Sequence, residues 1–298
     1  MRRGCPWGRH SGGVSVPASR AKRLLGADFR TGSPIWIDLG SPDTDAAAFY
    51  GAVFGRQYVS AGPAAGGYGF FQKDGKTVAA LGPLTQDGAT SAWATYFRSD
   101  DIQAATARGV AAGGGTVRVE PMNMGESRLA QFSDPQGAQF AVLQSNKGLE
   151  KASEDNTLVW VELHVGEPEA VMRFYDGLFG WRSEMPEPGM TYRVLSIKEG
   201  DQQEGSFGGV APLQGGQEMA RWVPYFAVAD ADAVVAAVQG NVLLAARAWQ
   251  VAGIVGDREP GEDHYGQLWP TLGTVFIWSC RSQCGTALKT AASRNDPR

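Results

Sequence analysis

Two stretches of the sequence alternate apolar and polar side chains around a tryptophan, which is typical of a half-buried strand. They are Pro34–Leu39 and Leu158–Val165. Each is followed by an apolar helical run that meets a glycine: Ala46–Val53 before Gly55, and Pro168–Phe179 before Gly180. Because glycine readily ends a helix, we expect a strand followed by a helix at both places.

Shorter apolar runs separated by glycine predict further strands over Tyr68–Gln72, Lys76–Leu81 and Trp93–Phe97. Helical spacing predicts two more helices, Ile102–Ala112 and Ala231–Val238. The turn signal Asp-Pro-Gln-Gly at 134–137 lies between two apolar runs, 129–132 and 139–143, and predicts a closing hairpin. We therefore expect an α+β fold with the helices on one side of curved, open, antiparallel sheets.

The strongest signal is an internal repeat. The run Trp36-Ile-Asp-Leu returns as Trp160-Val-Glu-Leu, 124 positions later. The pairs Phe-Tyr and Phe-Gly of 49–55 return at 174–180, and the run Trp93…Tyr-Phe returns at 222–226. A repeat that keeps this order and spacing predicts two copies of one module.

The repeat also sets the expected domain boundaries. We predict a basic, disordered tail over 1–32, a first module over 33–147, a polar linker over 148–155 and a second module over 156–280. Residues 241–263 have no counterpart in the first module, so we expect them to be irregular, and 281–298 to be a second disordered tail.

Composition narrows the classes of function. The 27 Lys and Arg residues against 31 Asp and Glu give no basic excess of the kind that binds nucleic acid. No apolar run reaches the ~20 residues that span a bilayer, and the N-terminus lacks a secretory signal, so we expect a cytoplasmic protein without a membrane partner. The three cysteines are too few for a disulfide framework or a four-ligand zinc site.

The order of strand, Phe-Tyr and Phe-Gly helix, further strands and Asp-Pro-Gln-Gly turn resembles the vicinal oxygen chelate superfamily, which includes glyoxalase I, bleomycin-binding resistance proteins and extradiol dioxygenases. The resemblance covers both copies and implies two tandem βαβββ modules forming open, curved sheets. It extends to double-module members associated with aromatic polyketide pathways. Fold alone does not fix function in such a superfamily.

The resemblance also implies where metal-binding members place His and Glu: on the first strand, before the second helix, and on the last strand. The matching positions here are apolar: Trp36 and Trp160; Trp93 or Ala94 and Trp222 or Val223; and Ala141 with Ile277. Because alkyl and indole groups do not ligate a divalent ion, we expect no metal and no cofactor.

Alternate residues of a strand share a face, so the first strands predict a wall of aromatic rings with a few polar groups. Such a wall suits a flat, partly oxygenated ligand. The candidate ligand-binding residues are Trp36, Asp38, Trp93, Met122, Gln139, Trp160 and Trp222. For the tryptophans, core packing remains the alternative to cavity lining. For Met122, which we expect in a loop, simple anchoring of that loop remains the alternative.

Two functions follow from this pattern. The first is metal-free binding of a polycyclic aromatic compound by an accessory or resistance protein that supports a late oxidation step, beside a partner oxygenase, in anthracycline-type antibiotic biosynthesis. The second is a metal-independent hydroxylase or isomerase in which Glu162 and His164 act as acid and base. A plain hydrogen bond between these two side chains is the alternative to catalysis. Pairing of two chains into a homodimer stays open.

Overall fold

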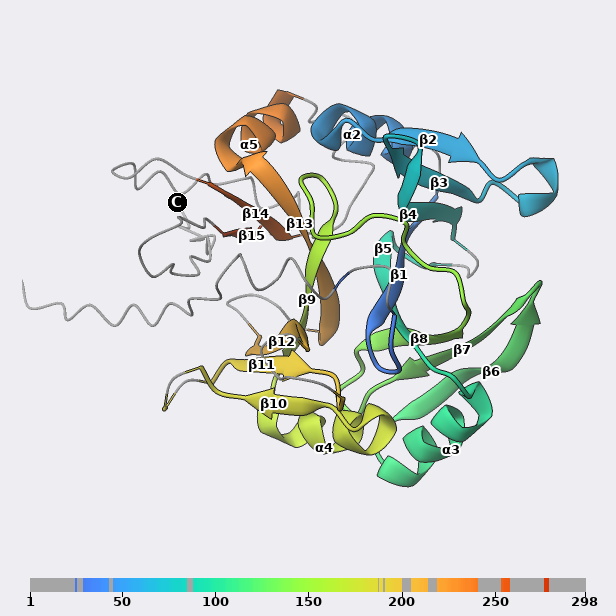
Figure 1. Ribbon diagram of the computed structural model, residues 1–298, viewed down its shortest axis with the longest axis vertical. Coiled ribbons are helices and arrows are strands. Elements are labelled where there is room, and N and C mark those ends of the chain that lie inside the picture. The colour runs from blue at the N-terminus through green and yellow to red at the C-terminus, as the bar shows by residue number, and fades with distance from the viewer. Residues whose placement is uncertain are drawn as a thin grey trace, which may run out of the picture.

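The computed structural model describes Leu25 and residues 29–42, 45–84, 88–186, 188–189, 191–199, 205–213, 219–240, 253–257 and 276–278. These residues form two open sheets with four α-helices, as the sequence predicts (Figure 1). Both sheets are mixed and not antiparallel as predicted, because strand 34–41 pairs parallel with 76–83, and 158–165 with 206–212. The predicted tail over 281–298, most of the tail over 1–32 and most of 241–263 lie outside the described residues.

The first copy contains the order strand, helix, three strands twice in succession, so it holds two βαβββ units where one was predicted. The first unit is β1 (Pro34–Ser41), α2 (Asp45–Phe54), β2 (Gln57–Ser60), β3 (Gly69–Lys73) and β4 (Lys76–Pro83), with a short 3-10 turn at Pro63–Ala65. The second unit is β5 (Ala92–Arg98), α3 (Ile102–Ala112), β6 (Thr116–Met124), β7 (Ser127–Ser133) and β8 (Gln139–Gln144). They combine in one eight-stranded sheet of order β2-β3-β4-β1-β5-β8-β7-β6.

The second copy repeats this plan with a shorter ending. Its elements are β9 (Leu158–Val165), α4 (Pro168–Phe179), β10 (Arg182–Glu184), β11 (Arg193–Ser196), β12 (Ser206–Pro212), β13 (Arg221–Asp230), α5 (Ala231–Gly240), β14 (Gly253–Asp257) and β15 (Phe276–Trp278). The sheet order is β10-β11-β12-β9-β13-β14-β15. The strand β14 pairs with β13 where β8 pairs with β5 in the first copy. Residues 253–257 are therefore a strand within the segment predicted to be irregular.

The predicted helix ends are confirmed by the backbone. Gly55 and Gly180 follow α2 and α4 with φ of 63° and 70°, and both amides bond back into the helix. Asp101 caps α3, because its Oδ1 accepts bonds from the amides of Gln103 and Ala104, both at 3.0 Å. Asp230 does the same for α5 through the amide of Ala233.

The core lies between the two sheets. One face of each sheet packs on its own helices and on the other sheet, with α2 against α5 at one end of the molecule and α3 against α4 at the other (Figure 1). Rings of the central strands β5 and β13 meet there: Phe97 lies 4.9 Å from Trp222, and Trp93 lies 5.4 Å from Phe226, between ring centroids. We call the opposite face of each sheet its open face.

Each copy also holds the segment that leads into the other copy. The Arg56 guanidinium donates to the carbonyl of Asn156 just before β9, and stacks on Phe226 at 4.1 Å. At the equivalent position of the second copy, the Trp181 indole donates to the carbonyl of Gly32 just before β1. Leu25 is also buried in the core, so the packed chain begins earlier than the predicted boundary at residue 33.

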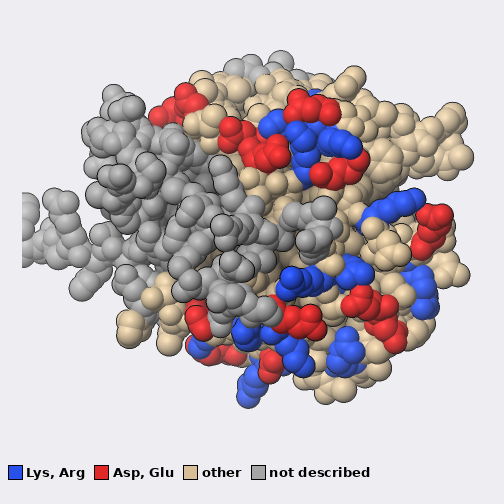
Figure 2. All heavy atoms as spheres, in the orientation of Figure 1, with Lys and Arg blue, Asp and Glu red and all other residues tan. Residues whose placement is uncertain are grey.

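Charged side chains on the surface are mixed in sign. Figure 2 shows acidic and basic groups side by side on the face in view. Several of them pair, as Lys147 does with Glu126 and Lys151 with Asp74, both at 2.9 Å. Within the described residues, no helix is both long and apolar enough to cross a bilayer.

Candidate functional site

The alternation of β1 separates a core face from the open face. Ile35, Ile37 and Leu39 are fully buried, whereas Trp36 and Asp38 are half-buried on the other side. Tyr96 of β5 joins them there, because it is the register partner of Trp36. Sequence periodicity alone therefore directs Trp36 and Asp38 to the open face, as predicted.

These side chains form a hydrogen-bonded group that we call the first cluster: Trp36, Asp38, Tyr68 and Tyr96. The Trp36 indole donates to the Tyr68 hydroxyl at 3.1 Å. The hydroxyls of Tyr68 and Tyr96 both donate to Oδ2 of Asp38, at 3.2 and 2.7 Å. From the described residues, no hydrogen bond reaches Oδ1 of Asp38. Both tyrosine hydroxyls thus bond to the same oxygen of a half-buried carboxyl.

Burial governs the protonation of the first cluster. It raises the pKa of Asp38 from 3.8 to about 6, against the lowering effect of the hydrogen bonds from Tyr96 and Tyr68. Burial and the nearby carboxylate raise the pKa of both tyrosines well above 10, so their hydroxyls remain donors at neutral pH. Near pH 6 the carboxyl can therefore either accept or donate a hydrogen bond.

Small residues lie beside the first cluster. Ala80 and Ala94 are the strand neighbours of Asp38 on its two sides, and Gly40 and Gly82 pair one step further along the strands. Gly82 is required by a close approach, because a Cβ there would lie 2.7 Å from the Tyr68 ring. Phe70 packs edge-on against Trp36, with centroids 6.2 Å apart. Asp38 thus has aromatic side chains on one side and residues with little or no side chain on the other.

The second copy repeats the plan in what we call the second cluster: Trp160, Glu162, His164, Tyr192 and Tyr225. The Trp160 indole donates to the Tyr192 hydroxyl at 3.1 Å, and Tyr192 donates to Oε2 of Glu162 at 2.9 Å. Tyr225 and Nε2 of His164 both bond to Oε1 of Glu162, at 3.0 and 2.7 Å. Both carboxyl oxygens are therefore engaged.

Burial distinguishes the two clusters. Glu162 is 2% exposed and His164 1%, and the whole first strand of the second copy is buried. The predicted contact between Glu162 and His164 is present. His164 and Glu162 share one hydrogen bond, and the carboxyl also accepts from two tyrosine hydroxyls. This buried, saturated geometry favours a plain hydrogen bond over an acid and base pair.

Trp93 and Trp222 do not reach either open face, contrary to the cavity-lining prediction. They are 5% and 4% exposed within the core, where their indoles donate to the hydroxyls of Tyr50 and Tyr175 at 3.0 Å. The reason is the alternation of β5 and β13, which turns each tryptophan toward the helices. The core alternative is therefore the correct one for this pair.

Met122 and Gln139 also lie outside the first cluster. Met122 belongs to the edge strand β6, four strands from β1, and not to a loop as predicted. Gln139 begins β8, is exposed, and accepts a bond from Arg118 at 2.7 Å. The bulged pairing of β6 with β7 explains the wrong loop prediction, because it interrupts the strand period.

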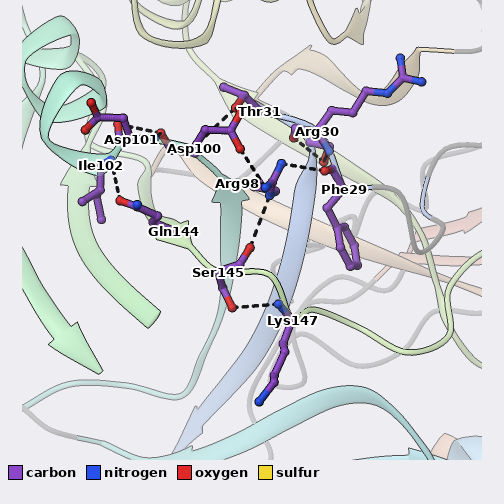
Figure 3. Close-up of polar contacts among 12 residues, drawn as sticks. Phe29, Arg30, Thr31, Arg98, Asp100, Asp101, Ile102, Gln144, Ser145 and Lys147 are labelled. Atoms are coloured by element: carbon purple, nitrogen blue, oxygen red, sulfur yellow. Dashed lines mark hydrogen bonds and ion pairs between the residues drawn. The ribbon is translucent and has the colours of Figure 1, made fainter. Parts of the chain in front are cut away.

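A separate polar network surrounds Arg98 at the end of β5 (Figure 3). Its guanidinium donates to the carbonyls of Phe29 and Ser145, at 2.8 and 3.4 Å, and pairs with Asp100 at 2.8 Å. Thr31 donates to the same carboxylate at 2.6 Å. These contacts tie the segment before β1 to the ends of β5 and β8, which is a structural role.

The chain is similar to anthracycline biosynthesis proteins and to putative glyoxylases. It is 37% identical over 231 residues to the anthracycline biosynthesis protein DnrV of Streptomyces peucetius, covering 70% of this chain and 81% of that protein. It is 35% identical over 222 residues to the putative glyoxylase CFP32 of Mycobacterium tuberculosis, covering 70% and 82%. Residues 36–142 match the Glyoxalase/Bleomycin resistance protein/Dioxygenase superfamily. The chain belongs to this superfamily.

Among solved structures with a similar fold, the Mn(II)-bound glyoxalase from Novosphingobium aromaticivorans is 18% identical, with a TM-score of 0.49 over 70% of each chain.

The residues at the positions where the resemblance implies metal ligands do not suit an ion here. Trp36, Ala94 and Ala141 lie on neighbouring strands in the first copy and supply no ligand atom. In the second copy, the strand neighbour of Tyr225 is Gly253, and Ile277 lies one strand further than predicted.

The carboxylates nearby do not replace the missing ligands. Within the described part of the chain, no group of three or more His, Cys, Asp or Glu side chains is placed to hold a metal ion. Asp38 has tyrosines as its polar neighbours, and Glu162 has one histidine. The donor set thus fits hydrogen bonding to an organic ligand better than ligation of a cation.

Sequence reasoning missed the four tyrosines of the clusters. A signal for them exists, because Tyr68 and Tyr192 are 124 positions apart, the same offset as Trp36 and Trp160. Tyr96 and Tyr225 belong to the recognised Trp…Tyr-Phe repeat. Repetition marks all four, but pairing each tyrosine with its carboxylate requires the sheet register.

Proposed function

We propose that the protein binds a polycyclic aromatic small molecule on the open face of the first sheet, without a metal ion. The observation that carries this proposal is the first cluster: a half-buried carboxyl whose Oδ1 accepts no hydrogen bond from the described residues, held by two tyrosines beside a half-buried indole and the small residues Ala94 and Gly40. Flat rings stack on Trp36 and Phe70, and a hydroxyl or carbonyl of the ligand bonds to Oδ1 of Asp38.

The biological role in this proposal is an accessory one in the biosynthesis of an aromatic polyketide antibiotic. Two relatives support it, DnrV and the anthracycline biosynthesis protein DauV of Streptomyces sp., which is 36% identical over 231 residues. Both are similar to this chain over its two copies. Presenting the bound ring system to a partner oxygenase for a late oxidation is the step that such a surface serves.

Titration with daunorubicin tests the binding. The chain has nine tryptophans, so quenching of the total emission does not locate the ligand. We expect Trp36→Phe to remove a measurable part of the quenching, and Trp160→Phe, its counterpart in the buried cluster, to remove little. Asp38→Asn should weaken binding about fivefold to tenfold, whereas Glu162→Gln changes it less than about twofold.

Mass spectrometry of the recovered ligand separates binding from catalysis. Return of unaltered daunorubicin supports the accessory role. New product masses that disappear in Glu162→Gln or His164→Ala would instead support the hydroxylase or isomerase. Equal daunorubicin affinity of the wild type and Asp38→Asn would refute the proposed site.

A further inference from the structure

Arg221 breaks the symmetry between the two open faces. It begins β13 and is the register partner of His164 on β9. The equivalent pair in the first copy is Ala92 with Gly40. The alternation of β13 places Arg221, Val223 and Tyr225 on the open face and Trp222 in the core. The second sheet therefore carries a guanidinium where the first has a methyl group.

This guanidinium has no counter-charge among the described residues. No hydrogen bond or ion pair joins Arg221 to them, and its buried Nε has no hydrogen-bond partner. The nearest candidate carboxylate, Glu162, already accepts from Tyr192, Tyr225 and His164. Burial lowers the pKa of Arg221, yet a guanidinium remains charged at neutral pH.

A half-buried cation without a partner is costly, because desolvation is not offset by any attraction. Arg221 is only partly buried, whereas the side chains of the second cluster are almost completely buried. The fork of a guanidinium matches the two oxygens of a carboxylate.

We infer that Arg221, at the start of β13, binds the carboxylate of a small molecule. This site is separate from the first cluster and takes a different class of ligand, an anion in place of a neutral hydroxylated ring system. It does not depend on ligand binding at Asp38, so the two sites fail or succeed independently.

The test compares two fluorescent probes on the full chain, anthracene-9-carboxylate and the neutral 9-anthracenemethanol. We expect the carboxylate to bind about tenfold more tightly than the alcohol to the wild type, and Arg221→Gln to remove that difference. Arg221→Lys should retain part of it, because an ammonium keeps the charge but loses the bidentate geometry.

Arg128→Gln is the matched control, because Arg128 is also half-buried and carries no ion pair among the described residues. It should bind both probes as the wild type does. Urea unfolding shows that each variant is folded, and Arg221→Gln should be at least as stable as the wild type because it removes an uncompensated charge. Equal affinity of the two probes for the wild type, or unchanged carboxylate affinity in Arg221→Gln, would overturn the inference.

Discussion

The first and second clusters are built on one plan and differ in how completely that plan is closed. In both, an indole donates to a tyrosine, and two tyrosines donate to the carboxylate of the first strand. In the second cluster both carboxyl oxygens accept from tyrosines, Oε1 also bonds to His164, and the side chains are buried. In the first cluster both tyrosines bond to the same oxygen of Asp38 and Gly40 stands where His164 does, so Oδ1 accepts no hydrogen bond from the described residues. Duplication thus preserved a scaffold, and the two copies differ in how deeply that scaffold is buried.

Removing each carboxylate should give the largest difference between the copies. In Glu162→Ala, the hydrogens of Tyr192, Tyr225 and His164 lose their acceptor inside the core, so we expect a loss of about 3–5 kcal/mol in the free energy of unfolding. In Asp38→Ala the freed hydroxyls can reach water, and about 1 kcal/mol is expected. Urea unfolding measures both, and equal losses would remove the distinction between a closed and an open cluster.

Substituting the glycines beside the tyrosines should also destabilise the second copy more than the first, by a smaller amount. A Cβ at Gly209 would overlap the hydroxyl of the buried Tyr192, so Gly209→Ala should cost about 2–3 kcal/mol. A Cβ at Gly82 would press on Tyr68, which is half-buried and can swing toward solvent, so Gly82→Ala should cost about 1 kcal/mol. Thermal unfolding at matched pH compares the two, and a larger cost at Gly82 would contradict the burial argument.

The core tryptophans supply a symmetric reference. Trp93→Phe and Trp222→Phe each remove one indole donor and leave a buried tyrosine hydroxyl without that bond. We expect similar losses of about 1–2 kcal/mol in the two copies. Daunorubicin affinity should be unchanged, since neither ring lies on an open face. Loss of binding in Trp93→Phe with stability intact would return this tryptophan to the cavity wall.

The pH dependence of the free energy of unfolding should contain a contribution from Asp38. The pKa of Asp38 is about 6 in the folded protein and near 4 when unfolded, so the folded state holds the proton more firmly. Stability from this group is therefore present below pH 4 and is lost as pH rises through 6, by about 3 kcal/mol at most. Subtracting the pH profile of Asp38→Asn isolates it, because the raised pKa of Asp134 contributes to both proteins. An identical slope in the variant would show that Asp38 is not perturbed.

The sequence predicts the parts of the molecule that depend on local period. Strand alternation directs Trp36 and Asp38 outward, and Gly55 and Gly180 end their helices where expected. What it does not predict depends on pairing between distant strands. The tyrosines reach their carboxylates only through the register, and β14 replaces the expected neighbour of β13 although residues 241–263 contain no repeat signal. The unequal burial of two nearly identical motifs is likewise a property of the whole fold.

The two reciprocal hydrogen bonds between the copies constrain how this protein can have evolved. Arg56 holds the entrance to the second copy, and Trp181 holds the entrance to the first. A gene fragment encoding one copy would therefore specify a sheet whose first strand lacks the side-chain hydrogen bond at its start. The side chain that makes such a bond to the other copy would have no acceptor. After fusion each copy depended on the other for this contact. Substitutions on the open face of either sheet could then accumulate without disturbing the interface between the copies.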